Sequence, residues 1–199
     1  MPHRLILASG SQIRRDLLLR AGVSCEQMSP RVDEESIKAS LLADAAKPRD
    51  IADTLAEYKA RRVSQKCPEA LVLGCDQVLE FEGDILSKPS SQTDLMDQMT
   101  RMRGKKHVLF SAAVIYDGGK PIWRSLTQAG MFMRNSSDAY LQDYISRNWD
   151  SIRHCVGGYQ LEAEGARLFS RIDGDYFTVL GMPLLDILNY LTMRGELQG

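Results

Sequence analysis

The sequence predicts an α/β protein with a mixed β-sheet, and three observations lead to this fold class. Short apolar runs typical of buried strands, such as residues 5–8 and 71–81, alternate with segments whose apolar residues recur at helical spacing. Turn-forming residues join some strands directly, as Asp117-Gly118-Gly119 does between strands expected at 108–116 and 122–133. Such hairpins add antiparallel pairs to a sheet whose other strands are connected through helices, so we expect a mixed sheet.

The first half of the chain starts with a strand at 5–8, which leads through Ser9-Gly10-Ser11 into a helix expected at 12–21. Gly22 ends this helix. An irregular stretch at 30–35 precedes a second helical region. Asp50 is expected to cap a further helix that ends near residue 65.

In the second half, the strand at 71–81 turns at 82–84 into a short strand at 85–86. Helices are expected at 93–103 and at 138–147, and Pro183 is expected to open a last helix through Leu191. The residues at 176–180 are aromatic and β-branched, a composition typical of a strand.

Composition bounds the class of protein. The 199 residues predict one domain over 1–199, and 25 Lys+Arg against 26 Asp+Glu argue against a nonspecific nucleic-acid binder. The four cysteines form no CxxC pair, so we expect reduced thiols. The apolar run at 5–8 is too short for a signal peptide, and no stretch approaches a membrane span. We therefore expect a cytoplasmic protein without membrane or nucleic-acid polymer as partner.

The loop after the first strand holds Ser9, Ser11 and Arg14 at the start of a helix. Unpaired N–H groups at a helix N-terminus favour anions, and arginine forks match phosphate oxygens. The loop is not a Walker A motif, because Gly-Lys-Ser/Thr is missing. The alternative interpretation is an ordinary Ser-capped helix with arginines in solvent.

Asp76 interrupts the otherwise apolar run at 71–79. A carboxylate in a buried strand is costly unless a cation or hydrogen-bond donors accompany it. Asp76 shares strand parity with Gly74, so we expect Gly74 to leave room for a ligand beside it. The alternative is a strand-end aspartate bonded to backbone.

Candidate partners for Asp76 occur elsewhere in the chain. Lys59 borders the apolar face of the helix that contains Leu55, and Lys88 follows the strand at 85–86. Residues 33–35 add further carboxylates. Each taken singly is typical of solvated surface, but together they fit a metal-bound polyphosphate.

These residues occur within ordered motifs that span nearly the whole chain: LILASGSQIRRDLL at 5–18, VDE at 32–34, LAEYKA at 55–60, GCDQV at 74–78, GDILSKP at 83–89 and RIDGDYFTVLGMPL at 171–184. In this order they resemble the Maf proteins, which are nucleoside-triphosphate pyrophosphatases. The resemblance implies an ITPase-like fold, with an elongated mixed sheet flanked by helices and a cleft between two lobes. It also implies a homodimer.

The resemblance further implies cleavage of a nucleoside triphosphate between its α and β phosphates, with a divalent cation (Mg²⁺, Mn²⁺ or Co²⁺) as cofactor. It makes Asp76 the general base and makes Glu34 and Asp76 the metal ligands. The residues that it assigns to the triphosphate are Ser9, Ser11, Arg14, Lys59 and Lys88.

Three positions bear on the nucleotide base. Where the UTP/dTTP branch of the family has Ala-Asp-Thr, this chain has Cys75-Asp76-Gln77, and where that branch has a later Gln it has Glu162. Gln77, His154-Cys155 and Glu162 are similar to the 7-methyl-GTP branch, although that branch has a Trp where this chain has Ile13. The alternatives are dTTP/UTP hydrolysis and a nucleotide-binding regulator of septum formation.

Glu162 offers a physical reason for a guanine base. A carboxylate can accept hydrogen bonds from the N1–H and the exocyclic amine of guanine, and it offsets the positive charge that N7 methylation adds. Uracil presents carbonyl oxygens beside its single N–H, a mismatch that costs about 1–3 kcal/mol. The alternative is that Glu162, or its neighbour Glu164, faces solvent.

Overall fold

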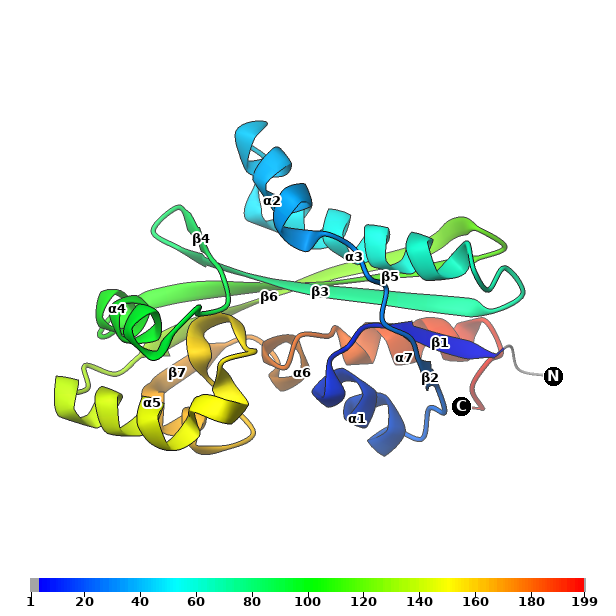
Figure 1. The fold of residues 1–199 in the computed structure, drawn as a ribbon. Helices are drawn as coiled ribbons and strands as arrows, with labels where there is room; N and C mark the ends of the chain where they lie inside the picture. The colour runs from blue at the N-terminus through cyan, green and yellow to red at the C-terminus, as the bar shows by residue number, and fades with distance from the viewer. Residues whose placement is uncertain (1–3, 199) are drawn as a thin grey trace.

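A seven-stranded mixed sheet forms the centre of the computed structural model, which describes residues 4–198 (Figure 1). The strand order is β2-β1-β3-β5-β6-β7, and β4 pairs with β3 off this path. The strand β1 pairs in parallel with β2 and β3, and every other pair is antiparallel, which confirms the mixed sheet. The bounds are β1 Leu5–Ala8, β2 Glu26–Gln27, β3 Leu71–Phe81, β4 Asp84–Leu86, β5 Lys106–Asp117, β6 Lys120–Met133 and β7 Phe169–Asp173.

Helices cover both faces of this sheet. In Figure 1, α2 and α3 lie on one face, whereas α1, α4, α5 and α7 lie on the other. None of the helices within residues 4–198 is both long and apolar enough to cross a membrane. The bounds are α1 Gln12–Arg20, α2 Glu34–Ala43, α3 Pro48–Ser64, α4 Gln92–Met102, α5 Asp138–Ile152, α6 Tyr176–Val179 and α7 Leu184–Met193, with 3₁₀ turns η1 at Val156–Gly158 and η2 at Glu164–Leu168.

Two predictions of secondary structure and helix capping are wrong. The segment at 176–180 is not a strand: it forms the short helix α6, because Asp175 caps its first turn by accepting a hydrogen bond from Thr178 N. Asp50 does not cap α3, which begins at Pro48 after Lys47. Proline has no N–H to lose at the first helical position, so it starts the helix before Asp50 is reached.

At Gly74, α3 packs directly against the backbone of β3. A Cβ atom at Gly74 would lie 2.2 Å from the carbonyl oxygen of Ala56 and 2.7 Å from the amide nitrogen of Ala60. The expectation that Gly74 leaves room for a ligand is therefore wrong, because helix backbone fills that space. The close approach has a functional consequence: it brings Lys59, which lies between these two alanines, to the level of Asp76.

His107 is a buried, uncharged group in the core near the far end of β3. Its side chain is 1% exposed, its Nε2 lies 2.7 Å from Tyr159 Oη, and its Nδ1 has no hydrogen-bond partner within residues 4–198. Burial lowers the pKa of His107 from 6.5 to about 4. Between these pH values the unfolded chain binds a proton that the folded chain does not bind.

We expect the stability that the neutral His107 contributes to be complete above pH 6.5 and to be lost as the pH falls toward 4. At pH 5 this loss amounts to about 2 kcal/mol of unfolding free energy. The measurement is urea unfolding of wild type and His107→Gln at pH 7.5 and pH 5. Glutamine retains a hydrogen-bonding group for Tyr159 but does not titrate, so its stability should fall less between the two pH values. Equal losses in both proteins would contradict the assignment.

Candidate active site

Nearly all the predicted site residues come together around one cavity of about 200 Å³. Its walls come from α1, α2, α3, β3, β4 with the segment after it, residues 154–162 and residues 179–180 at the end of α6, so segments far apart in the sequence share one site. The predicted site residues that line it are Ser11, Ile13, Arg14, Glu34, Lys59, Asp76, Gln77, Lys88 and Glu162.

Asp76 and Lys59 form the buried centre of this cavity. Asp76 is 5% exposed and so is Lys59, and Lys59 Nζ lies 2.5 Å from Asp76 Oδ1. The same ammonium lies 3.0 Å from Glu34 Oε2 at the start of α2. One buried cation thus holds two carboxylates, and its own charge is compensated by them.

The two carboxyl groups differ in proton affinity. Burial raises the pKa of Asp76, and the attraction of Lys59 and Arg14 only partly offsets this effect. Burial also acts to raise the pKa of Glu34, but the attraction of Lys59, with smaller contributions from Lys88 and Arg14, lowers the pKa of Glu34 overall. Asp76 is therefore the stronger base of the pair, as a proton-accepting role requires, whereas Glu34 stays ionised.

Arg14 is buried rather than exposed to solvent. It is 9% exposed, and it donates from Nε to Gly181 O at 2.8 Å and from Nη1 to Cys75 O at 2.9 Å. Ser11, the N-cap residue of α1, makes no side-chain cap, so the first N–H groups of α1 are not satisfied by it. Neither feature fits an ordinary Ser-capped helix with solvated arginines, and both favour an anion at this end of the cavity.

Ser9 lies behind the cavity wall instead of lining it. Its Oγ accepts hydrogen bonds from Ser11 N at 3.2 Å and from Arg14 Nη1 at 3.3 Å, and its side chain is 3% exposed. In this arrangement Ser9 holds the loop and Arg14 in place. Its direct contact with phosphate stays a prediction.

Lys38 is a cation of the site that the sequence reasoning missed. It lines the cavity, and its Nζ donates to Ser87 Oγ at 2.7 Å and to Glu35 Oε1 at 2.9 Å. The signal was present, because Lys38 stands four residues after Glu34 and therefore on the same face of α2. Through its contact with Ser87, Lys38 places a second lysine next to the segment that contains Lys88.

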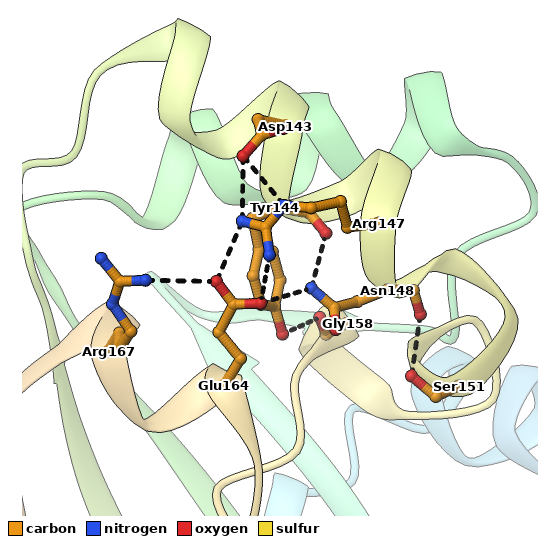
Figure 2. A network of polar contacts seen from close by, with 8 residues as sticks. All are labelled: Asp143, Tyr144, Arg147, Asn148, Ser151, Gly158, Glu164 and Arg167. Atoms are coloured by element: carbon orange, nitrogen blue, oxygen red, sulfur yellow. Dashed lines mark hydrogen bonds and ion pairs between the residues drawn. The ribbon is translucent and has the colours of Figure 1, made fainter.

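The carboxylates of Glu162 and Glu164 have different surroundings. Arg147 holds the pKa of Glu164 at about 2, with help from Asn148. Figure 2 shows this network: Arg147 and Asn148 of α5 converge on Glu164, and Arg167 adds a third contact. Glu162 lines the cavity, and within residues 4–198 its carboxylate has no hydrogen bond or ion pair. Glu164 is thus tied to α5. Glu162 borders the cavity as an exposed residue, so both solvent and a ligand can reach its carboxylate.

The donor set around Lys59 is compatible with a hard divalent cation. Glu34 and Asp76 both offer carboxylate oxygens, the ligand type that Mg²⁺ and Mn²⁺ prefer. No group of three or more His, Cys, Asp or Glu side chains able to hold a metal occurs within residues 4–198. Two carboxylates completed by substrate phosphates and water are a common arrangement for Mg²⁺. The residues present therefore fit a metal that arrives with a phosphorylated substrate.

A buried carboxylate, cations that line the cavity beside it and an uncapped helix N-terminus are the features of an α/β enzyme site for a phosphorylated ligand. Comparison with known proteins agrees with this class. The chain is similar to a nucleoside triphosphate pyrophosphatase of Ruegeria pomeroyi (61% identity, 96% of each chain), one of Roseobacter denitrificans (59%, 99% of each) and one of Ruegeria sp. TM1040 (57%, 100% of each). The model of the Maf-like protein family matches residues 4–194. The chain belongs to the Maf family.

Proposed function

We propose that this chain hydrolyses 7-methyl-GTP, or a closely related modified nucleotide, to the monophosphate and pyrophosphate with a divalent cation as cofactor. The coarser activity follows from the relatives. They are 57–61% identical over essentially the whole chain, so the nucleoside triphosphate pyrophosphatase activity in their names applies to this chain as well. The modified guanine base and the metal are the parts that we infer.

One observation carries the proposal. The same cavity holds a buried carboxylate with cations suited to a triphosphate, namely Asp76 with Lys59 and Lys88, and an unpaired carboxylate, Glu162, suited to a base. A triphosphate needs neutralising charge, and a guanine ring needs hydrogen-bond acceptors facing its N–H groups. The presence of both kinds of group in one cavity supports the proposal.

For the reaction, Asp76 accepts a proton from a water molecule. Lys59 occupies Oδ1 of Asp76, so Oδ2 is the oxygen that takes the proton. The water oxygen then forms a bond to phosphorus as the bridging bond between the α and β phosphates breaks, and pyrophosphate leaves. Arg14, Lys59 and Lys88 hold the phosphate oxygens and stabilise the charge that develops on them.

A divalent cation held by Glu34 and Asp76 would supply further charge neutralisation at the phosphates when it is bound. Lys59 already lies between these two carboxylates and offsets one of their two negative charges before any metal binds. The ionised state of Glu34, which Lys59 favours, suits a metal ligand.

In this proposal Glu162, Gln77 and Ile13 select the nucleotide base. Glu162 accepts hydrogen bonds from N1–H and the 2-amino group of guanine and offsets the positive charge of the methylated ring. Gln77 and Ile13 also line the cavity, and Ile13 gives the base an apolar contact where the 7-methyl-GTP branch has a Trp.

We expect wild type to release pyrophosphate fastest from 7-methyl-GTP when it is offered with GTP, UTP and dTTP in the presence of Mg²⁺, Mn²⁺ or Co²⁺. Glu162→Gln is expected to lower kcat/KM for 7-methyl-GTP by about 10–100-fold, because a neutral amide presents a donor to the base and removes the compensating charge. Its effect on UTP should be small. The measurement is pyrophosphate release under steady-state conditions.

Glu35→Gln is the matched control, since Glu35 also lines the cavity but pairs with Lys38. It should leave the order of substrates unchanged. A preference of wild type for UTP or dTTP would contradict the role of Glu162 and favour the sister activity. Binding without turnover of any triphosphate would favour a nucleotide-binding regulator instead.

We also infer that the active form is a homodimer, as the resemblance to the Maf family implies. Light scattering on the purified protein tests this: a mass of one chain at micromolar concentration would contradict it.

A further inference from the structure

The motif at 171–184 contributes none of the predicted site residues, yet part of it contacts two of them. Within this motif, residues 175–181 form α6 and the turn that follows it. Gly181 O accepts a hydrogen bond from Arg14 Nε at 2.8 Å. Thr178 O and Val179 O each lie 3.0 Å from Gln77 Nε2. One short segment therefore holds both a phosphate-facing and a base-facing side chain.

The contacts of Arg14 determine how its guanidinium is turned. Two fixed carbonyls, Gly181 O and Cys75 O, accept from Nε and Nη1. Because the five N–H donors of an arginine lie in one plane, two fixed acceptors define the orientation of the whole fork. Within residues 4–198 its Nη2 has no protein partner, so this nitrogen is the one left for a phosphate oxygen.

The contacts of Gln77 determine which end of its amide faces the ligand. Backbone carbonyls can only accept, so Thr178 O and Val179 O require the amide nitrogen rather than the oxygen. Ser111 Oγ, which lies 3.1 Å from the same nitrogen, gives its single proton to Thr178 O at 2.8 Å and can therefore only accept from Gln77. The amide oxygen is unbonded and not among the buried unpaired atoms, so it is offered to the cavity as an acceptor.

Asp175 holds this segment in place from outside the cavity. Its Oδ1 accepts a hydrogen bond from Thr178 N at 2.9 Å, its Oδ2 accepts from Thr178 Oγ1, and its own side chain is exposed. The helix α6 has four residues, too few to be stable without such a cap. Thr178 Oγ1 also lies 2.8 Å from Thr127 Oγ1, which ties α6 to β6.

We propose that Asp175 is a positioning residue for both halves of the substrate. By capping α6 it fixes the carbonyls of residues 178–181, which aim Arg14 at phosphate and turn the Gln77 amide oxygen toward the base. An acceptor at that position selects a base that presents an N–H donor, such as an exocyclic amine, over one that presents a carbonyl. The identity of this ligand rests on the function proposed above, whereas the positioning does not.

The test compares Asp175→Ala with Asp175→Asn, which keeps a capping oxygen. We expect Asp175→Ala to raise KM for 7-methyl-GTP about tenfold and to narrow the ratio of kcat/KM between 7-methyl-GTP and UTP by a similar factor, because both guiding side chains are loosened. Asp175→Asn should restore most of both values. The matched control is Ser137→Ala, which removes the equivalent cap of α5 away from the cavity. It should lower the melting temperature and leave KM and the ratio unchanged.

A second readout does not depend on turnover. The side-chain amide protons of Gln77, assigned by NMR through their loss in Gln77→Met, should exchange slowly in wild type and about tenfold faster in Asp175→Ala. If wild type hydrolyses no nucleotide, the proposed function fails and this exchange still decides the positioning role. The proposal would be overturned if Asp175→Ala kept the wild-type KM, the wild-type ratio of kcat/KM values and the wild-type exchange rate of the Gln77 amide protons. It would also be overturned if Ser137→Ala changed these quantities as much as Asp175→Ala does.

Gly181→Ala keeps the proposal testable if Asp175→Ala does not fold. Gly181 has a φ of +93°, and a Cβ atom there would lie 3.0 Å from Arg14 Nη2. We expect this variant to weaken binding of inorganic pyrophosphate about tenfold by calorimetry, because it displaces Arg14. The exchange of the Gln77 amide protons should stay close to wild type. Unchanged pyrophosphate binding would overturn the role of the segment in placing Arg14.

Discussion

Asp76→Asn is expected to abolish most of the turnover while the protein stays folded. An amide cannot accept the proton of the attacking water, so kcat should fall by about 10²–10⁴-fold. The fold should survive because Lys59 keeps Glu34 as a partner. In addition, a neutral amide at this position does not carry the cost of burying a charge that the Asp76 carboxylate does. Pyrophosphate release and thermal unfolding, measured on the same preparation, check both parts.

The control for this variant is Glu80→Gln, on the same strand but away from the cavity. Glu80 accepts a hydrogen bond from Gly83 N in the turn between β3 and β4, and it does not line the cavity. Its variant should keep the wild-type rate. A rate near wild type in Asp76→Asn would remove Asp76 as the base.

Lys59→Met is expected to have the second-largest effect, and it acts on both catalysis and stability. Methionine fills similar volume but leaves Asp76 and Glu34 without the cation that holds them. We expect kcat/KM to fall by about 10²–10³-fold, because the enzyme loses a fixed cation that stabilises the negative charge developing on the phosphate oxygens in the transition state. We expect the free energy of unfolding to fall by about 3 kcal/mol, because a buried carboxylate loses its partner. Steady-state kinetics and urea denaturation measure the two effects.

The double variant Asp76→Asn with Lys59→Met separates these two effects. Removing the buried carboxylate as well removes the unpaired charge, so the double variant should be more stable than Lys59→Met alone. Turnover should remain lost. Lys66→Met, at an exposed position just beyond the end of α3, is the matched control and should behave as wild type. Equal stability of the double and the single Lys59 variant would contradict the buried pair.

Parts of the fold were predictable from local sequence because their causes are local. The strand at 71–81 is a continuous apolar run, and it forms with those bounds as β3. The segment at 176–180 was misassigned because its aromatic and β-branched composition favours a strand, whereas one capping contact from Asp175 favours a helical turn. A single cap of this kind outweighs a weak propensity over four residues.

The sequence predicted which residues belong to the site better than it predicted how they contact one another. The residues around Asp76 were identified from charge in unusual places and from the resemblance, and all the predicted site residues but Ser9 line one cavity. Lys38 was missed because exposed lysines on helices are usually solvated. That Glu164 is paired while Glu162 is not depended on Arg147, a residue of α5 that no local pattern connects to either glutamate.

The sequence by itself determined the family, the mixed α/β fold class and the chemical types that a triphosphate site needs, since periodicity, turn residues and ordered motifs are properties of neighbouring residues. Only the tertiary structure decided which groups meet. Gly74 lets α3 pack closely on β3 so that Lys59 reaches Asp76, and carbonyls of residues 178–181 accept hydrogen bonds from Arg14 and Gln77 at the cavity wall. Such distances follow from sheet register and helix packing, which join residues remote in the chain.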